Sequence, residues 1–425
     1  CWYTRVNEVG HFSYGGIKTM NKTPKSNVHD PGKLNWMKGF PPPHEKVVRF
    51  AEKSFYAWPQ LRWSLSHIDE LMPTKRVWRG AGPCRALPQK LQMFDDLMIV
   101  TLNGTELCWD DALEQSYTDG LLVLHGGEVV YEEYFGACAP DVRHIIQSAN
   151  KSFVGILAES LIHEGKLDAN ALVSAIIPEL INSAYGDATV QQVLDMLIGM
   201  EFHEDYLDPE SEIWRFHRAT GMSPPSSINE FELVADVLPN VKKAGRHGEA
   251  FAYREPNIFV LGWIVRRSGM QDLTTQLSER VWQHIGAEHD GYYIMDPGGA
   301  ESSSGFTLRD FARFGELVRT GGVIERKQVI PAAVIDKVLL GGDQGLFAKA
   351  GYKTLPGWSY KSQWWIRHLP DRNCAVARGA HGQVLYVDPA NELVIARFGS
   401  APKAPSTLLD DIFLPMLDVI TTRLS

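Results

Sequence analysis

The distribution of apolar and polar residues divides the chain into three kinds of segment. Residues 1 to about 115 are rich in Pro, Trp and charge and have little regular periodicity, which indicates an irregular arm with short helices. Between 148 and about 340, apolar residues recur at helical intervals. Short apolar, β-prone runs in 120–134 and after 355 predict strands.

Helices are predicted where apolar residues recur every three or four positions. In the first such segment, apolar residues at 153, 156, 157 and 161 form one buried stripe. Pro256 fits the first turn of a later helix and Gly269 fits its end. The predicted helices cover 148–164, 188–199, 229–238, 256–268, 272–284, 307–320 and 331–340, and a closing helix covers 408–423.

Strands are predicted at both ends of the helical region. Two apolar runs flank Gly126-Gly127, which is typical of a β-hairpin. Asp388-Pro389-Ala390-Asn391 predicts the turn of the last hairpin. The later strands are predicted at 363–366, 374–377, 384–387 and 393–398.

Strands at both ends with helices between them predict a sheet built from distant parts of the chain. The expected fold class is α+β, with a mostly antiparallel sheet flanked by helices and an inserted all-helical domain. Within a main body of 116–425, the sheet part would be 116–147 and 341–425, and the helical part 148–340. The N-terminal arm, 1–115, would pack on this body, and a cleft is expected where sheet and helices meet.

The composition fits a globular protein with small-molecule substrates. A chain of 425 residues with 44% hydrophobic content can bury a large core, and we expect one or two domains. The formal charge is −9 and no basic run occurs, so nucleic acid and anionic membranes are poor partners. No stretch approaches the roughly 18 apolar residues of a membrane-spanning helix.

The five cysteines are widely spaced and form no Cys-x-x-Cys pair, which disfavours a structural zinc site. Free thiols favour a cytoplasmic location. The sequence begins at Cys1 without Met, so a periplasmic or secreted protein with a removed signal peptide is also compatible with it.

The tetrapeptide Ser148-Ala149-Asn150-Lys151 carries the clearest chemical signal. Residues three apart on a helix share a face, so the hydroxyl and the amine can meet without help from distant chain. A serine hydroxyl is a poor nucleophile until a neighbouring base takes its proton. Lysine can be that base when burial or a nearby cation favours its neutral form.

The position of Ser148 and Lys151 at the start of a helix strengthens this interpretation. Lys151 lies in the first turn, where the helix dipole disfavours a cation. The same helix start aims backbone N–H groups at Ser148, where they could stabilise an oxyanion.

Several further segments make the chain resemble the serine β-lactamase-related hydrolases, which share the penicillin-recognising fold. Within that group the chain is most similar to the 6-aminohexanoate-dimer hydrolases, which cleave nylon oligomers. The resemblance runs from about residue 36 to the C-terminus, and it implies the β-lactamase/transpeptidase-like form of the α+β class. It is carried by 36–42, 148–151, 204–212, 253–257, 305–310 and 379–389.

The resemblance implies a catalytic role for Tyr253. This residue fills the first position of the family's Tyr-x-Asn motif, and such a tyrosine can relay a proton to the leaving group. The third position is Glu255 rather than Asn, so the substrate-contacting amide of the family is absent.

The family's third motif, Lys-Thr-Gly, aligns with Ala377-Arg378-Gly379. In β-lactamases the missing lysine and threonine hold the substrate carboxylate, so their absence argues for esters or other amides. By resemblance, the N–H groups of Ser148 and Ala380 form the oxyanion hole.

The resemblance also indicates two substrate-binding residues. In the nylon-oligomer enzymes a tyrosine in the loop before the catalytic tyrosine helps to hold the reacting amide, and Tyr206 occupies that loop. His381 follows the proposed oxyanion donor. It either contacts substrate or is a structural histidine that is hydrogen-bonded to the strand.

The predicted function is hydrolysis of amide or ester bonds through an acyl-enzyme, with no metal and no cofactor. The same Ser-Lys-Tyr mechanism would also serve a short-chain carboxylesterase or a D-amino-acid peptidase. A non-catalytic binding protein and a metal-dependent hydrolase are weaker alternatives, because the three residues are intact and no ligand cluster is visible. The substrate is a small-molecule amide or ester. A homodimer is compatible with the sequence, which does not fix the oligomeric state.

Overall fold

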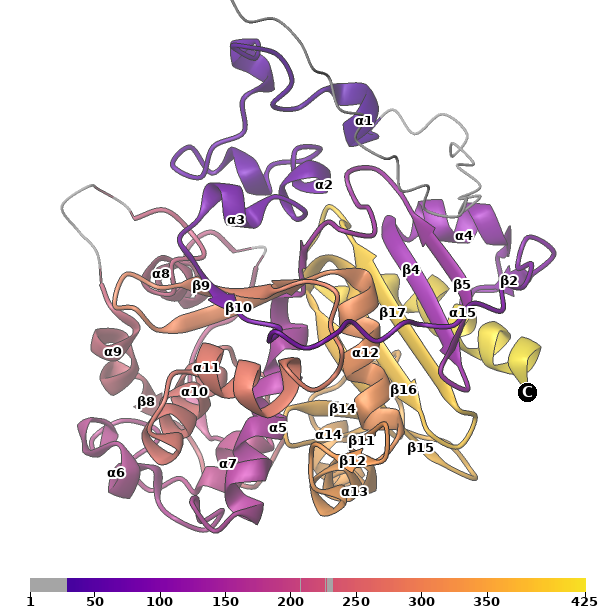
Figure 1. Ribbon diagram of the computed structural model, residues 1–425. Helices are drawn as coiled ribbons and strands as arrows, with labels where there is room; N and C mark the ends of the chain where they lie inside the picture. Colours follow the sequence, from indigo (N-terminus) through magenta and orange to yellow (C-terminus); the bar gives the residue numbers. More distant parts are fainter. Residues whose placement is uncertain (1–28, 207, 226, 228–231) are drawn as a thin grey trace, which may run out of the picture.

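The computed structural model describes residues 29–206, 208–225, 227 and 232–425, and a seven-stranded antiparallel sheet forms its largest layer (Figure 1). The strand order is β13-β14-β15-β16-β17-β4-β5, so the two strands near residue 120 join the edge of a sheet made by the C-terminal third of the chain. The strands are β4 (Thr118–His125), β5 (Glu128–Tyr134), β13 (Ser359–Lys361), β14 (Trp364–His368), β15 (Asn373–Gly379), β16 (Gln383–Asp388) and β17 (Leu393–Gly399).

Both predicted hairpin turns are confirmed. Gly126 and Gly127 join β4 to β5 with φ values of 58° and 82°. Positive φ at both central residues is what a two-residue hairpin turn requires, and glycine adopts it without steric cost. In the turn between β16 and β17, the Asp388 carboxylate accepts a hydrogen bond of 3.2 Å from the Asn391 backbone N–H.

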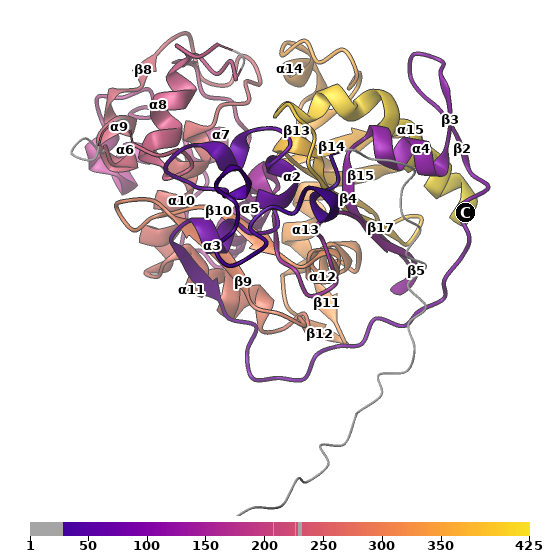
Figure 2. The ribbon, with the colours of Figure 1, turned by 90° about the horizontal axis from the view of Figure 1, so that it is seen from above.

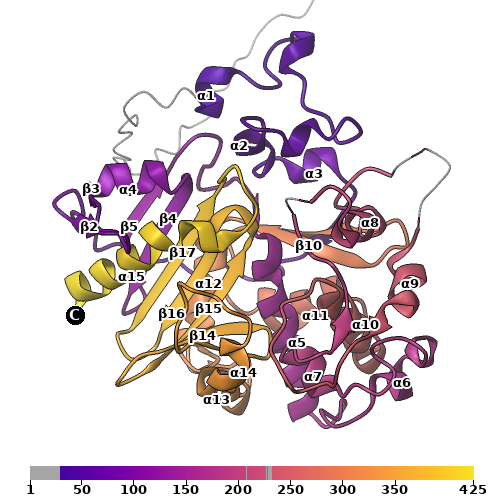
Figure 3. The ribbon, with the colours of Figure 1, turned by 180° about the vertical axis from the view of Figure 1, so that it is seen from behind.

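Alternate residues along each strand pack into two different hydrophobic clusters. On β4, Leu122 and Leu124 belong to one cluster, together with residues of α12 (Leu308–Arg319). Leu121 and Val123 belong to the other, together with residues of α15 (Asp410–Leu424). The two helices therefore cover opposite faces of the sheet, α12 in Figure 1 and α15 in the reverse view of Figure 3.

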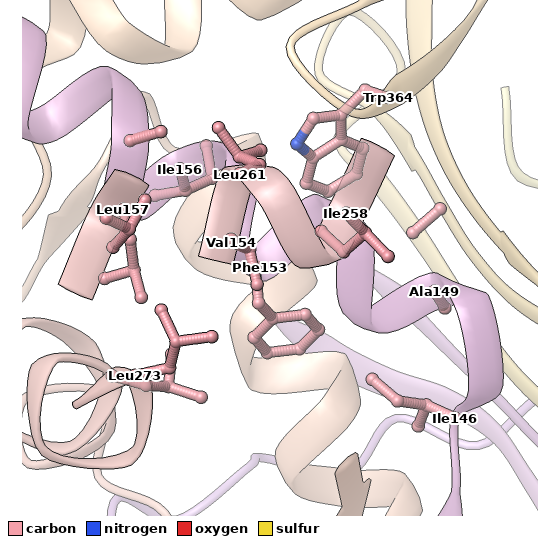
Figure 4. Packing of buried hydrophobic residues seen from close by; sticks show 14 of the residues in the cluster. Ile146, Ala149, Phe153, Val154, Ile156, Leu157, Ile258, Leu261, Leu273 and Trp364 are labelled. Carbon is pink, nitrogen blue, oxygen red and sulfur yellow. The ribbon is translucent and has the colours of Figure 1, made fainter. Parts of the chain in front are cut away.

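The helical part packs around α5 (Asn150–His163), which is buried over most of its length. Ile156 and Leu157 of α5 lie in one cluster with Leu261 of α10 (Pro256–Gly269), and Trp364 of β14 contributes to the same cluster (Figure 4). This shared core joins the helical part directly to the sheet.

Most predicted helices are present. Pro256 occupies the first turn of α10 and Gly269 is its last residue, both as expected, and Met270 follows in the left-handed conformation (φ 56°). The prediction for 188–199 is too long, because the chain leaves the helix before Met196, whose φ is 55°. The other predicted segments contain α7 (Val190–Leu194), α9 (Val234–Val237), α11 (Leu273–Leu277), a π-helical turn η6 (Ser278–Trp282) and α13 (Ala332–Leu340). In the predicted segment 229–238, residues 229–231 lie outside the described residues.

A second, four-stranded sheet lies partly inside the segment that the sequence predicts as helical. Its strand order is β1-β9-β10-β6, and its pairs are antiparallel. The sequence did not reveal β10, because Glu301-Ser302-Ser303-Ser304-Gly305 has no apolar alternation. The strands are β1 (Thr74–Val77), β6 (His144–Ile145), β9 (Gly291–Met295) and β10 (Glu301–Phe306). The division of the chain into domains stays a prediction.

The part of the N-terminal arm with α1, α2 and α3 lies across the top of the molecule, and the later part runs along the body to α4 beside the seven-stranded sheet (Figures 1 and 2). It contains short helices, as expected, and a buried ion pair fastens it to the body: Arg62 lies 3.1 Å from Asp119 of β4. Besides β1, the arm elements are α1 (Pro31–Leu34), η1 (His44–Lys46), η2 (Ser54–Tyr56), α2 (Leu61–Ser64), α3 (Ile68–Leu71), β2 (Met98–Val100), β3 (Glu106–Cys108) and α4 (Trp109–Gln115).

Among the described residues, no helix has both the length and the apolar character needed to cross a membrane. The four described cysteines, Cys84, Cys108, Cys138 and Cys374, are free thiols. Cys1 lies outside the described residues.

Candidate active site

Ser148 and Lys151 lie at the start of α5, where the sequence places them. Ser148 is in the short helical turn η3 (Gln147–Ala149), which leads directly into α5. The Lys151 ammonium nitrogen lies 2.9 Å from the Ser148 hydroxyl oxygen. The Lys151 side chain is only 3% exposed, so its amine is shielded from bulk water. The local spacing therefore produces the nucleophile–base contact that Ser-Lys chemistry needs.

Glu255 also belongs to the site. From the sequence it was noted only as the residue that replaces the substrate-contacting Asn of the family. Its carboxylate lies 2.7 Å from the Lys151 nitrogen, so Lys151 bridges Ser148 and Glu255. Residue 255 immediately precedes α10, which packs against α5, and this packing brings together two residues 104 positions apart. In the sequence, the one indication of this contact was a carboxylate at the position where the family has Asn, in a site that also contains a buried lysine.

Tyr253 lies beside the pair, and its phenol is held in the neutral form. Burial raises the pKa of Tyr253 well above its usual value, and the negative charge of Glu255 raises it further, while a hydrogen bond with Ser148 opposes the shift. The Lys151 nitrogen lies 5.1 Å from the ring centroid. A neutral phenol can donate a proton, so the geometry favours proton delivery over action as a phenolate base.

The end of β15 brings Ala380 to the rim of the same site. Gly379 packs so closely on Ile146 that a Cβ atom at this position would overlap the Ile146 carbonyl oxygen. Glycine therefore lets β15 approach the segment that carries Ser148, and Ser148 and Ala380 line the same two pockets.

Replacing Gly379 by Ala should reduce activity while leaving the fold intact. The added methyl group must push β15 away from Ile146, and such overpacking costs about 1–3 kcal/mol. We expect kcat/KM to fall about tenfold or more, because oxyanion donors act only at short distances. Steady-state kinetics with a nitrophenyl ester measures the effect. Gly82→Ala is a control, since a Cβ there would meet no neighbour and the backbone does not have a positive φ. Equal losses in the two variants would contradict the argument.

The two predicted substrate-binding residues both line the pocket beside Ser148. The Tyr206 hydroxyl lies 3.5 Å from a Glu204 carboxylate oxygen, and its ring contacts Trp214. The Nδ1 atom of His381 lies 2.7 Å from the Ala401 carbonyl oxygen. This hydrogen bond holds the ring in place, as expected if His381 is a structural histidine. Burial lowers the pKa of His381 to about 4, so the neutral ring presents Nε2 as an acceptor.

Two adjoining pockets, each of about 240 Å³, meet at Ser148. The first is walled largely by apolar and aromatic side chains, and Tyr56 of the arm closes one side. Its apolar wall includes Tyr206, Trp214, Met222, Ile258 and Phe259. The second contains Tyr253, Trp365 and two arginines. The arm therefore contributes to the site, which the sequence analysis did not predict.

Glu204 forms a second carboxyl group next to Glu255. It accepts a hydrogen bond of 2.7 Å from the Glu255 backbone N–H. Burial raises the pKa of Glu204 to about 8, and the nearby Glu255 carboxylate adds to the shift. Glu204 therefore keeps its proton at neutral pH, and the site holds one carboxylate beside Lys151.

The raised pKa of Glu204 predicts that this group destabilises the fold as pH rises. Between its ordinary value of 4.5 and about 8, the folded state holds a proton that the unfolded state has lost. Stability contributed by Glu204 is therefore fully present below about pH 4.5 and is lost as pH approaches 8. Glu204→Gln should flatten this part of the pH–stability profile in urea unfolding, with Glu210→Gln as a control. An unchanged slope would refute the assignment.

Within the described part of the chain, no group of three or more His, Cys, Asp or Glu side chains is arranged to hold a metal ion. Ser148, Lys151 and Tyr253 bring a hydroxyl, an amine and a phenol together, which are the groups that the Ser-Lys-Tyr prediction requires.

Comparison with known proteins agrees with this geometry. Residues 111–413 match the family model described as Beta-lactamase. The chain belongs to the β-lactamase family. A curated relative, the 6-aminohexanoate-dimer hydrolase of Paenarthrobacter ureafaciens, is 34% identical over 353 residues, which are 81% of this chain and 86% of that protein.

Solved structures extend the comparison. A Bacillus anthracis protein that bears the name of a 6-aminohexanoate-dimer hydrolase superposes with a TM-score of 0.80 and 28% identity, covering 90% of this chain and 98% of that one. A family VIII carboxylesterase superposes with a TM-score of 0.55 at 15% identity, covering 74% and 96% of the two chains, which shows a shared fold alone. The chain is thus a serine hydrolase of the β-lactamase family with a β-lactamase/transpeptidase-like fold, as the sequence analysis expected.

Proposed function

We propose that this protein hydrolyses linear amides of the 6-aminohexanoate-dimer type, with Ser148 as the nucleophile. The observation that carries the proposal is the buried contact of 2.9 Å between the Ser148 hydroxyl and the Lys151 amine. The curated relative named for this activity supports the choice of substrate. The apolar pocket beside Ser148 fits a methylene chain.

The proposed reaction begins with transfer of the Ser148 proton to Lys151. The Glu255 carboxylate, 2.7 Å from the same nitrogen, can take up a proton from the ammonium group and return the amine to its neutral form. The serine oxygen attacks the amide carbonyl, and the N–H groups of Ser148 and Ala380 receive the oxyanion. The neutral Tyr253 phenol gives its proton to the leaving amine and regains one from the Lys151 ammonium group. Water then attacks the acyl-enzyme, its proton passes to Lys151, and Lys151 returns a proton to the Ser148 oxygen as the acid leaves.

Tyr206 and His381 are assigned to substrate binding in this scheme. Both lie in the pocket wall next to Ser148, and each presents a polar group at the end of an otherwise apolar surface. A homodimer is proposed as the physiological assembly, and the mechanism does not depend on it because Ser148, Lys151 and Tyr253 all come from one chain.

The test is hydrolysis of the linear 6-aminohexanoate dimer, measured beside a short acyl nitrophenyl ester. Cleavage of the dimer supports the amidase proposal. Cleavage of the ester alone would favour a carboxylesterase with the same mechanism, and the absence of both activities would refute the proposal.

A further inference from the structure

A third pocket, of about 480 Å³, lies next to the apolar pocket beside Ser148. Among the described residues, Tyr56, Tyr206 and Trp214 line both of these pockets, so their side chains form the boundary between them. Ser148 is not part of the described wall of the third pocket, which consists mainly of apolar and aromatic side chains. A substrate chain that is too long for the apolar pocket would have to pass this boundary.

The position of Tyr253 indicates which half of the substrate occupies the apolar pocket. Tyr253 lines the second pocket at Ser148 but is not part of the described wall of the apolar one. The group that protonates the leaving nitrogen must lie on the leaving-group side of the scissile bond. The second pocket therefore takes the leaving amine and the apolar pocket takes the acyl half. The third pocket lies beyond the far end of the acyl half.

Tyr56 is the boundary residue that comes from the N-terminal arm, where it ends the turn η2. Its hydroxyl accepts a hydrogen bond of 3.4 Å from the side-chain amide of Gln147, the residue before Ser148. Its ring contacts Phe55, with 4.2 Å between ring centroids, and stacks on His381 at 6.1 Å. These contacts on several sides hold the phenol ring in one orientation at the pocket wall.

The arm is fastened close to the nucleophile, so the place of the Tyr56 ring is fixed relative to the reacting bond. The Ile145 backbone N–H donates a hydrogen bond of 2.9 Å to the Leu65 carbonyl oxygen, which ties the arm to β6. The buried ion pair of Arg62 with Asp119 adds a second attachment. Burial raises the pKa of Tyr56 to about 12, so the phenol stays neutral at physiological pH.

We propose that Tyr56 sets the upper length of the acyl group by closing the apolar pocket against the third pocket. This inference rests on the proposed function and adds a specificity-determining residue, supplied by the arm. A hexanoyl group ends at the phenol ring, whereas a longer chain meets it. Tyr56 can also be shortened with the least effect on the fold, because Tyr206 and Trp214 pack against the core of the helical part.

Binding to the Ser148→Ala protein measures this limit without turnover. Isothermal titration calorimetry would compare 6-aminohexanoate that carries a hexanoyl group on its nitrogen with the same compound carrying a decanoyl group. With Tyr56 present, we expect the decanoyl compound to bind no more tightly than the hexanoyl compound. With Tyr56→Ala added, it should bind about tenfold or more tightly, because each methylene group that becomes buried strengthens binding about fourfold.

Three further variants separate the size of the ring from other effects. Tyr56→Phe keeps the ring, so it should keep the ratio of the two dissociation constants. Trp58→Ala is the matched control on the arm, because Trp58 contacts Tyr117 and lies outside the described walls of all three pockets. Tyr56→Trp enlarges the ring and should weaken binding of the hexanoyl compound relative to an acetyl compound, which provides a second test if Tyr56→Ala folds poorly.

Three results would overturn the proposal. The first is tighter binding of the decanoyl compound while Tyr56 is still present. The second is a ratio of dissociation constants that Tyr56→Ala leaves unchanged. The third is an equal change in Trp58→Ala, which would mean that loosening of the arm, and not the ring, sets the limit. Hydrolysis of the 6-aminohexanoate dimer by the wild-type protein separately tests the proposed function.

Discussion

Ser148→Ala abolishes hydrolysis of both amide and ester substrates, with an expected loss in kcat/KM of about 10⁴-fold or more. The reason is that, in the proposed mechanism, the serine oxygen forms the covalent bond of the acyl-enzyme, and the Lys151 nitrogen lies 2.9 Å from it. Lys151 contacts Ser148 and Glu255 directly and so serves this one nucleophile.

A loss of activity caused by the missing nucleophile must be distinguished from a loss caused by disruption of α5. Ser160→Ala removes a hydroxyl from the same helix, where it bonds only to the Ile156 carbonyl oxygen one turn earlier. This control should keep wild-type activity and a similar thermal midpoint. Trapping of an acyl-enzyme by mass spectrometry should succeed with the control and fail with Ser148→Ala. Hydrolysis at more than a few per cent of the wild-type rate in Ser148→Ala would rule out Ser148 as the nucleophile.

The part of the site that the sequence predicts best is the part that local geometry determines. Ser148 and Lys151 lie three residues apart at a helix start, so their contact needs no information about the rest of the fold. The strands from 363 to 398 were predictable for a similar reason, since their apolar and β-branched residues are confined to short runs between turn residues.

The features that the sequence did not reveal depend on tertiary contacts. Strand β10 is rich in serine, and its Ser304 hydroxyl donates a hydrogen bond of 2.9 Å to Asn150 at the start of α5. A hydrogen bond between residues so far apart in the chain leaves no pattern of apolar and polar positions in the sequence. It matters for function, because β10 pairs with β6 and β6 leads directly to Ser148.

The charge interactions of the site also depend on tertiary contacts and could not be predicted from the sequence. The pairing of Lys151 with Glu255 joins residues 104 positions apart, and only the packing of α10 against α5 creates it. The neutral state of Tyr253 follows from its burial and from the charge of Glu255. Sequence alone allowed either a phenolate or a phenol at this position, and the structure favours the phenol.

Lys151→Arg is expected to reduce kcat/KM by about 10³-fold or more while the protein stays folded. A guanidinium group can keep the ion pair with Glu255, so the partly buried carboxylate is not left without a counter-ion. It cannot give up its proton at any usable pH, so it cannot accept the proton of Ser148. The variant therefore separates the chemical role of Lys151 from its role as a partner of Glu255.

Two comparisons make the result of Lys151→Arg decisive. Lys337→Arg is the control, because Lys337 forms a similar ion pair of 2.8 Å with Glu159 of α5 at a position away from both pockets, and its activity should be unchanged. Lys151→Met should lose activity to the same degree and also lower the urea midpoint, since it leaves Glu255 without its counter-ion. If Lys151→Arg retained activity close to wild type, Lys151 would act only through its charge, and Glu255 or a water molecule would have to take the serine proton.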